Sequence, residues 1–386
     1  MLQWRLFDEE EYIQLCEELF AAYYACRSNK RNKLQALHFE RNLEANLFLL
    51  ADEIFSGEWR PAPSQAFLVT RPVRREVFAA TFRDRIVHHW LMAHLNPHFE
   101  AMFIVDSYAC RTGKGTHFGI NRLKSHLKEE PMAWVLRLDI QGFFMNIHRQ
   151  LLWRRLDDFI ICRMDLRRSE NQRIHAICEL LACWDATRGA KRRGPLQDWR
   201  LLPRDKSLFT TPPGCGLPIG NLTSQTFANF FLHPLDVFIQ QDLGINSYGR
   251  YVDDLYIVDG SKERLKACIP QIRDFLQREL QLRLHPRKIH LQQGCKGAAF
   301  LGAVVWPGYS TPGKRLKGNF YDAVSRLIAG DEDEERARAI WASYTGMLKH
   351  HRAQQFLQRQ AVRLQSGAMT QRTDWAGAPG TCQRSR

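Results

Sequence analysis

Three aspartates are the residues of this chain whose types and spacing could do chemistry. Asp253 and Asp254 are adjacent in the apolar, strand-like run "YVDDLYIV", and Asp139 ends a second such run, "WVLRLDIQGFF". Clustered carboxylates in an apolar setting are costly unless a divalent cation compensates them. A surface turn with two solvated aspartates is the alternative for Asp253 and Asp254 alone. The third carboxylate favours a metal site, because two strands of one sheet can place Asp139 beside Asp253.

The charge balance suggests what such a metal site would act on. Carboxylates around two hard cations about 3.5–4 Å apart stabilise both the attacking and the leaving oxygen of an in-line phosphoryl transfer. The chain carries 55 Lys and Arg against 41 Asp and Glu, a formal net charge of +14, which favours a polyanionic partner. A basic surface combined with this carboxylate trio predicts a nucleic-acid polymerase.

Helices and strands must position these residues, and their pattern predicts an α+β fold. Apolar residues that recur every three or four positions predict helices at 8–56, 82–103, 148–184, 224–243, 261–281 and 318–364. Alternating or β-rich runs predict a basic hairpin at 65–80, a buried strand at 133–144, a hairpin with Asp253 and Asp254 at its tip, and short strands at 290–306. Gly and Pro predict an exposed loop at 185–215, and the composition from Ser366 onward predicts a disordered tail.

Several classes of protein do not fit the sequence. No stretch approaches the roughly 20 apolar residues of a transmembrane helix, so we expect no membrane partner. The N-terminus is acidic and amphipathic rather than a signal peptide. Ten cysteines without CxxC pairs predict reduced thiols, which indicates a cytoplasmic protein.

The order of the motifs resembles the palm of a reverse transcriptase. "RLDIQGFF", "GLPIGNLTSQ", "YVDD", "LHPRKIHL" and "FLGAVVW" follow one another in that family's order, and the resemblance runs from about residue 65 to residue 350. It implies a right-hand polymerase fold with fingers, an antiparallel palm and a helical thumb. The implied limits are 1–64 for an N-terminal helical extension, 65–132 for fingers, 133–305 for the palm with the 185–215 insertion, 306–365 for the thumb and 366–386 for the tail.

The resemblance assigns metal and proton-transfer roles. Asp139 and Asp253 would bind two Mg²⁺ ions, for which Mn²⁺ could substitute. Asp254 would assist, and the backbone carbonyl of Ile140 would add a ligand. Lys288 matches the lysine that protonates the departing pyrophosphate; as a lone lysine it would be a solvated surface charge.

Nucleotide binding is implied at three places. Phe144 matches the steric gate that rejects a ribose 2′-OH, whereas core packing is its alternative role. The loop 219–225 would approach the nucleotide, and an ordinary helix N-terminus is the alternative there. Arg75, with Arg71 as a second candidate, would contact the triphosphate through a bidentate guanidinium. The residues expected in the 219–225 loop are Ile219, Gly220, Asn221, Ser224 and Gln225.

Primer and template contacts complete the implied site. Tyr251 and Val252 precede the paired aspartates, and Leu301 with Gly302 matches the primer-grip hairpin. Lys349 and Arg352 lie in a basic C-terminal segment that would hold the duplex through its phosphates. A solvated helix face is the alternative for that segment.

The form of the motifs is most similar to reverse transcriptases of diversity-generating retroelements. "GLPIGNLTSQ" has Ile219 where retroviral enzymes carry Gln, and it closes Ser-Gln rather than Ser-Pro. That family implies error-prone, adenine-mutagenised cDNA made from a template-repeat RNA for mutagenic retrohoming, with dNTPs as substrates. It also implies a small, basic, helical, oligomeric accessory protein as a partner.

Two alternatives stay open. A retron, group II intron-derived or phage-defence reverse transcriptase would keep the chemistry and change the biology. A non-catalytic nucleic-acid-binding palm relic would keep the fold alone, although it would have little reason to retain three uncompensated carboxylates.

Overall fold

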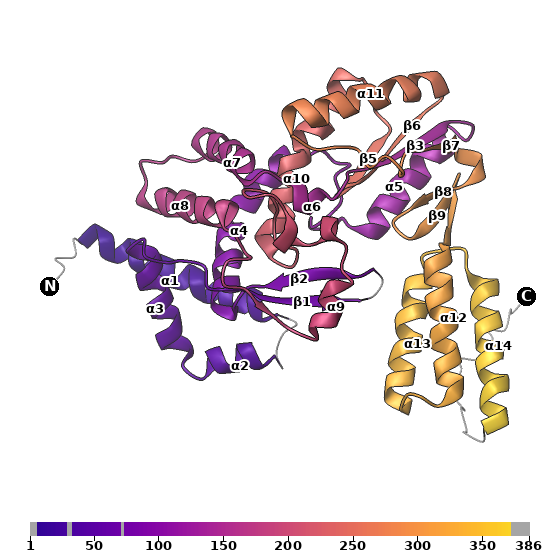
Figure 1. Cartoon of the computed structure of the whole chain (residues 1–386), viewed down its shortest axis with the longest axis horizontal. Coiled ribbons are helices and arrows are strands. Elements are labelled where there is room, and N and C mark those ends of the chain that lie inside the picture. The colour runs from indigo at the N-terminus through magenta and orange to yellow at the C-terminus, as the bar shows by residue number, and fades with distance from the viewer. Residues whose placement is uncertain (1–5, 29–32, 71–72, 372–386) are drawn as a thin grey trace, which may run out of the picture.

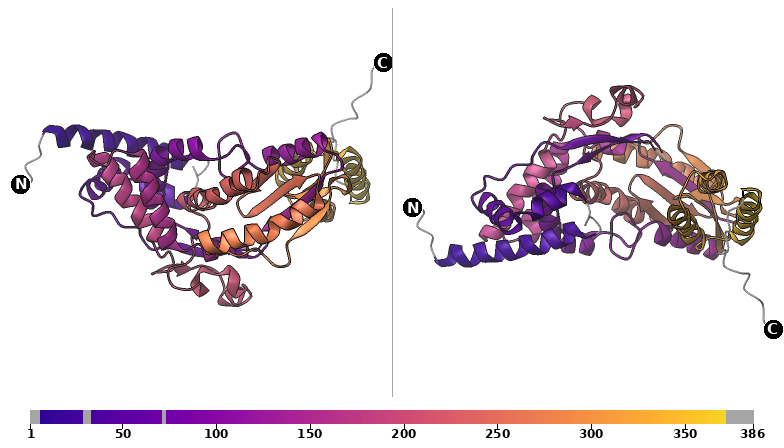
Figure 2. Two further views of the ribbon diagram at one scale, coloured as in Figure 1. Left: turned by 90° about the horizontal axis from the view of Figure 1, so that it is seen from above. Right: turned by 90° about the horizontal axis from the view of Figure 1, so that it is seen from below.

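The computed structural model describes residues 6–28, 33–70 and 73–371. The molecule is elongated, with N-terminal helices at one end and a three-helix bundle at the other (Figures 1 and 2). Its elements mix helices with short, mainly antiparallel sheets, so the α+β prediction is confirmed.

A four-stranded antiparallel sheet lies between the two ends of the molecule. Its strands run in the order β5 (Tyr248–Tyr251), β6 (Asp254–Asp259), β3 (Trp134–Asp139) and β7 (His290–Gln293). The central register pairs Trp134 with Asp259 at one end and Asp139 with Asp254 at the other. Both aspartates therefore lie at one end of the two central strands.

Alternation along these strands separates two buried faces. Leu136, Leu138, Leu255 and Ile257 belong to the large core that includes α11 (Lys262–Glu279). The intervening side chains, such as Val135 and Tyr256, pack instead with α5 (Thr116–Glu129) and the strands β8 (Ala298–Phe300) and β9 (Ala303–Trp306). The sheet is thus covered on both faces, which explains its nearly continuous apolar sequence.

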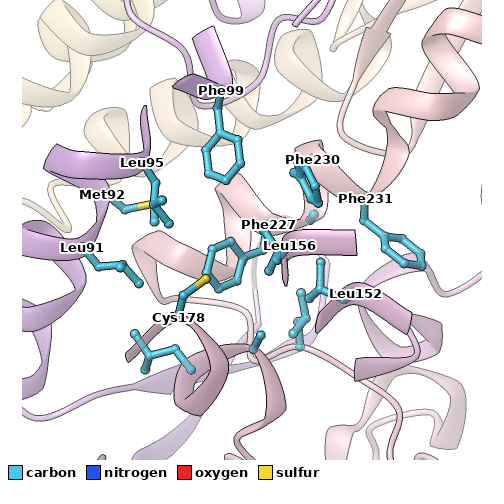
Figure 3. Packing of buried hydrophobic residues seen from close by; sticks show 14 of the residues in the cluster. Leu91, Met92, Leu95, Phe99, Leu152, Leu156, Cys178, Phe227, Phe230 and Phe231 are labelled. Atoms are coloured by element: carbon cyan, nitrogen blue, oxygen red, sulfur yellow. The ribbon is translucent and has the colours of Figure 1, made fainter. Parts of the chain in front are cut away.

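The large core is centred where four helices meet. These are α4 (Phe82–Met102), α7 (Arg149–Arg163), α8 (Ser169–Cys183) and α10 (Leu222–Val237). Figure 3 shows Phe99 of α4, Leu156 of α7 and Phe227 of α10 converging there. The N-terminal helices α1 (Leu6–Arg27), α2 (Leu34–Glu40) and α3 (Leu43–Phe55) pack onto the same core, so they form a continuous body with it.

The predicted basic hairpin is present as β1 (Gln65–Val69) and β2 (Arg75–Ala79), paired antiparallel. The 185–215 segment was expected to be an exposed loop, and this is wrong in part. It adds β4 (Lys191–Arg192) in parallel to β1 and contains α9 (Leu196–Arg200) and two single turns, Arg204–Lys206 and Leu208–Thr210. Its apolar residues have no regular spacing, yet Leu208 is buried beside Phe78 in a separate small core.

The C-terminal bundle consists of α12 (Lys314–Ala329), α13 (Glu334–Leu348) and α14 (Gln354–Gln371). It follows a hairpin of β9 with β10 (Tyr309–Pro312), and it has its own core around Phe320, Val324 and Leu348. The disordered tail was expected from Ser366, but α14 continues to Gln371. Once Leu364 is packed on the bundle, extending the helix adds a hydrogen bond per residue at little cost. Residues 372–386 of the expected tail lie outside the described residues.

Two further observations bear on the expectations. Among the described helices, none combines the length and the apolar character needed to cross a membrane. The cysteines of the described residues form no disulfides with one another, in line with the prediction from their spacing.

Candidate active site

The three aspartates are brought together at the end of the central strands. Asp139 and Asp254 are direct cross-strand partners, so their side chains emerge on the same face of the sheet. Asp253 lies in the turn just before β6, and the amide of Ile140 donates to its carbonyl at 3.3 Å. Asp254 is therefore a strand residue, whereas the sequence predicted that both aspartates lie at the hairpin tip. Strand pairing of Asp254 with Asp139 accounts for the difference.

The pKa values of these carboxyls reflect their burial and their closeness to one another. Burial, followed by the neighbouring Asp139 carboxylate, raises the pKa of Asp253 to about 7. Burial also raises the pKa of Asp254 to about 6, against the lowering effect of Arg137, whose guanidinium lies 3.6 Å from Asp254 Oδ1. Such a cluster is stabilised in its ionised form by added positive charge, as a divalent cation supplies.

Lys288 supplies one positive charge directly. Its Nζ lies 2.8 Å from Asp139 Oδ2, and its side chain is about half exposed. The amide of His285 donates to the Asp139 carbonyl at 2.8 Å, so the loop carrying Lys288 is attached to the end of β3. Lys288 can therefore reach both the carboxylates and the solvent in front of them.

The turn before Asp253 has an unusual backbone. Val252 has φ of +57°, a left-handed conformation that a β-branched residue rarely adopts. Val252 is half-buried against the large core, and its carbonyl accepts a hydrogen bond from Arg250 Nη1 at 3.0 Å. These contacts hold Val252 in this conformation.

Arg250 is a residue that the sequence reasoning missed. Its guanidinium is fully buried and binds Asp236 through Nε at 2.7 Å and Nη2 at 2.6 Å. It also donates to Asn229 Oδ1 at 3.2 Å and to Ser107 Oγ at 3.2 Å. An arginine two positions before the turn, inside an apolar strand, was the signal that could have identified it.

Phe144 lies on the short helix α6 (Phe143–Asn146) that follows Asp139. It is half-buried and contacts both the large core and the small core that includes Ile219. Its partial burial fits both roles considered for it, since one side packs while the other stays accessible. Phe143, its neighbour on α6, is buried in the large core.

The loop at 219–225 is fastened to β2. The carbonyl of Ile219 accepts from the amide of Phe78 at 2.7 Å. Gly220 has φ of +122°, and a Cβ there would lie 2.6 Å from the Phe78 carbonyl oxygen. Glycine is thus required for the approach of this loop to β2, and the expected approach to a nucleotide stays a prediction.

Polar side chains of this loop are mostly engaged within the protein. Asn221 is buried at the N-terminus of α10, and its Oδ1 accepts from the Ala80 amide at 3.4 Å. Ser224 is buried as well. Gln225 is half-buried, and its Oε1 accepts from Cys110 Sγ at 3.0 Å. Asn221 and Ser224 are thus packed at this helix end, and their expected contact with a nucleotide stays a prediction.

The remaining expected residues surround these elements. Arg75 begins β2 and is exposed, whereas Arg71 lies outside the described residues. Tyr251 is the cross-strand neighbour of Asp254 on β5. Leu301 and Gly302 have φ of +48° and +83°, which makes the β8–β9 turn a tight one with consecutive left-handed residues.

Lys349 and Arg352 lie between α13 and α14, where the bundle meets β10. Both are exposed. The Arg352 amide donates to the Ser310 carbonyl at 2.7 Å, and its guanidinium lies over the Tyr309 ring at 5.5 Å. These two cations are therefore at the junction of the bundle with the rest of the chain.

A family model described as "Reverse transcriptase (RNA-dependent DNA polymerase)" matches residues 72–305. The chain is 23% identical over 346 residues to "Protein YkfC" of Escherichia coli (strain K12), covering 80% of this chain and 81% of that protein.

Among solved structures, a truncated apo telomerase from Candida tropicalis is similar with a TM-score of 0.44 and 13% identity. The match covers 65% of this chain and 54% of the telomerase chain, so this chain spans about half the length of that relative.

The matched region contains β3, the Asp253 turn, α10 and the Lys288 loop. The chain therefore belongs to the reverse transcriptase family, and it is an RNA-directed DNA polymerase with a right-hand polymerase fold.

Proposed function

We propose that Asp139, Asp253 and Asp254 hold two Mg²⁺ ions in this enzyme, with Mn²⁺ as a substitute. Reverse transcriptase domains generally use divalent metal ions. The donor set fits, because three carboxylates meet at the end of one sheet and two of them have raised pKa values. When bound, the ions supply charge neutralisation and alignment for phosphoryl transfer. The Ile140 carbonyl is proposed as a further oxygen ligand.

Around this centre the chain's own residues bind and orient the substrates. Lys288, placed beside Asp139, is proposed to donate a proton to the departing pyrophosphate. Arg75 is proposed to bind the triphosphate, and Phe144 to exclude the ribose 2′-OH. Tyr251, Val252, Leu301 and Gly302 are proposed to contact the primer and template.

The biological role that we propose is the synthesis of error-prone cDNA, mutagenised at adenines, from a template-repeat RNA for mutagenic retrohoming. The observation that carries this proposal is Ile219 in "GLPIGNLTSQ". An apolar side chain cannot make the hydrogen bond of the Gln found in retroviral enzymes, which would loosen selection of the incoming nucleotide. Ile219 and Phe144 share one apolar cluster, so a change at one affects the packing of the other.

Primer extension on a defined RNA template, followed by cDNA sequencing, tests the proposal. The wild-type chain should give metal-dependent cDNA with errors opposite adenines, and Asp253→Asn should give no product. Ile219→Gln should lower the adenine error rate about tenfold while keeping synthesis. Accurate wild-type cDNA would favour a retron, intron-derived or phage-defence enzyme. Absence of product from the wild type under every condition would favour the non-catalytic relic.

A small, basic, helical, oligomeric accessory protein is proposed as a partner, and extension should be measured with and without it. The N-terminal helices have exposed apolar side chains, among them Ile13, Tyr24 and Phe48, that a partner could cover. Activity that is independent of any added protein would contradict an obligate partner and leave the polymerase assignment intact.

A further inference from the structure

The 185–215 segment, called here the basic insertion, has no part in the site described above. It is nevertheless held firmly against the sheet of β1 and β2. The Lys191 amide donates to the Ser64 carbonyl at 3.0 Å, and the Arg193 amide donates to the Ala66 carbonyl at 2.7 Å. These bonds make β4 the edge strand of that sheet.

A buried carboxylate fastens the other half of the insertion. Glu76 on β2 is fully buried and accepts hydrogen bonds from Ser207 Oγ, at 2.9 Å, and from the Leu208 amide. Arg192 turns back onto the insertion itself, with its guanidinium 3.9 Å from the centre of the Phe209 ring. The insertion is therefore a fixed element attached to the β1–β2 sheet.

The insertion also comes close to the catalytic end of the palm sheet. A Cβ added to Gly142, three residues after Asp139, would lie 3.5 Å from the Asp205 carbonyl oxygen. Leu208 packs with Met145 of α6 in the small core, which Phe144 and Ile219 also contact. The α9 segment itself projects from the body of the molecule in both views of Figure 2.

The outward surface of the insertion is strongly positive. Besides Arg192, six exposed cations are distributed over β4, α9 and the turns around them, and none makes an ion pair with any residue that the structure describes. They are Arg188, Lys191, Arg193, Arg200, Arg204 and Lys206. Backbone hydrogen bonds to the β1–β2 sheet fix Lys191 and Arg193 in place. Arg204 and Lys206 precede the turn that Glu76 fastens, close to the catalytic end of the palm sheet. Arg200 lies on the projecting α9.

We propose that the basic insertion binds the phosphates of single-stranded template RNA ahead of the active site. It lies on the β1–β2 sheet and is separate from the helical bundle that is proposed to hold the duplex (Figures 1 and 2). Lys and Arg neutralise phosphates without reading sequence, so such a surface would accept any template. The inference rests on the family's RNA-directed activity and is independent of the proposed mutagenic role.

A triple variant tests it: Lys191→Gln with Arg200→Gln and Arg204→Gln, one change each in β4, α9 and the following turn. Binding to a primer–template with a template 5′ overhang of about 8 nucleotides should weaken about tenfold at moderate salt. The slope of log K against log salt should fall by about 2, the value for three lost single-strand phosphate contacts. A blunt primer–template should bind within about twofold of wild type, since it lacks the overhang.

The matched control is Lys266→Gln with Arg273→Gln and Arg278→Gln, three exposed cations of α11. It removes the same net charge from α11, which has no part in the basic insertion, and should leave overhang binding nearly unchanged. If the control and the insertion variant lost overhang binding equally, the effect would be one of general charge, and the proposal would be overturned. An unchanged salt slope, or an equal loss on the blunt duplex, would overturn it too, while primer extension by the wild type reports separately on the polymerase itself.

Discussion

At the scale of single residues, the protonation of Asp253 connects stability with metal binding. Without a divalent ion, folded Asp253 keeps its proton up to about pH 7, whereas an unfolded aspartate loses it near pH 3.9, an approximate reference value. The folded state then binds more protons between these two pH values. The contribution of this group to the free energy of unfolding therefore falls as the pH rises through that window.

This gives the first prediction. In EDTA, the Tm of Asp253→Asn should rise relative to that of the wild type as the pH goes from 5 to 8. The rise should be about 2–4 °C for each kcal/mol of unfolding free energy that the wild type loses over this range and the variant keeps. Mg²⁺ should raise the wild-type Tm more at pH 8 than at pH 6, because bound carboxylates must be ionised. Thermal melts of both proteins measure this, with the exposed Asp274→Asn as control. A Mg²⁺ effect that is equal at both pH values would contradict it.

Lys288 gives a second prediction at this scale. Replacing it with Gln removes the cation 2.8 Å from Asp139 Oδ2 and the proposed proton donor. We expect kcat to fall about 10²-fold with a smaller change in KM for dNTP, as for loss of a general acid. Steady-state extension kinetics measure both, and Lys266→Gln on α11 is the surface control. An unchanged kcat would mean that Lys288 is a structural partner of Asp139 and nothing more.

At the scale of elements, the β5–β6 hairpin depends on one buried ion pair. Arg250 joins β5 to Asp236 on α10, to Asn229 and to the segment at Ser107, and it donates to the Val252 carbonyl. The strained turn that presents Asp253 is thereby tied to the helical core. Arg250 acts as a positioning residue, since its contacts are with the protein itself.

The third prediction concerns this residue. Arg250→Met should destabilise the fold by about 3–5 kcal/mol, because it leaves Asp236 buried and unpaired. Arg250→Lys keeps the positive charge but loses the two-pronged guanidinium that binds Asp236. We therefore expect this variant to fold, with kcat about tenfold lower and KM little changed. Adding Val252→Gly should restore part of kcat, because glycine adopts positive φ without help. A Lys variant with lowered Tm but normal kcat would assign Arg250 to stability alone.

At the scale of the whole molecule, the C-terminal bundle has its own core and joins the rest of the chain near β10, where Lys349 and Arg352 are exposed.

The fourth prediction is that Lys349→Gln with Arg352→Gln raises KM for primer–template and leaves kcat nearly unchanged. The salt slope of duplex binding should fall by about 2, as for two lost phosphate contacts. Filter binding measures it, with Arg273→Gln and Arg278→Gln as control. An unchanged slope would favour a solvated helix face.

The sequence predicted the elements well where the pattern was strong and local. Amphipathic spacing located the long helices, and β-rich runs located β3, β5 and β6, since these signals come from neighbours along the chain. The fastening of the 185–215 segment was not predictable. Its anchoring hydrogen bond joins Ser207 to Glu76, which are 131 residues apart.

The sequence by itself determined which side chains could do chemistry, because three carboxylates set in apolar runs of a basic chain are candidate cation ligands before the fold is known. The tertiary structure alone decided how they meet. It set the register that pairs Asp139 with Asp254, and it buried Arg250 against Ser107, 143 residues away, to hold the Val252 turn. Strand registers and buried ion pairs depend on contacts between segments that are distant in the sequence, so they cannot be derived from periodicity or composition.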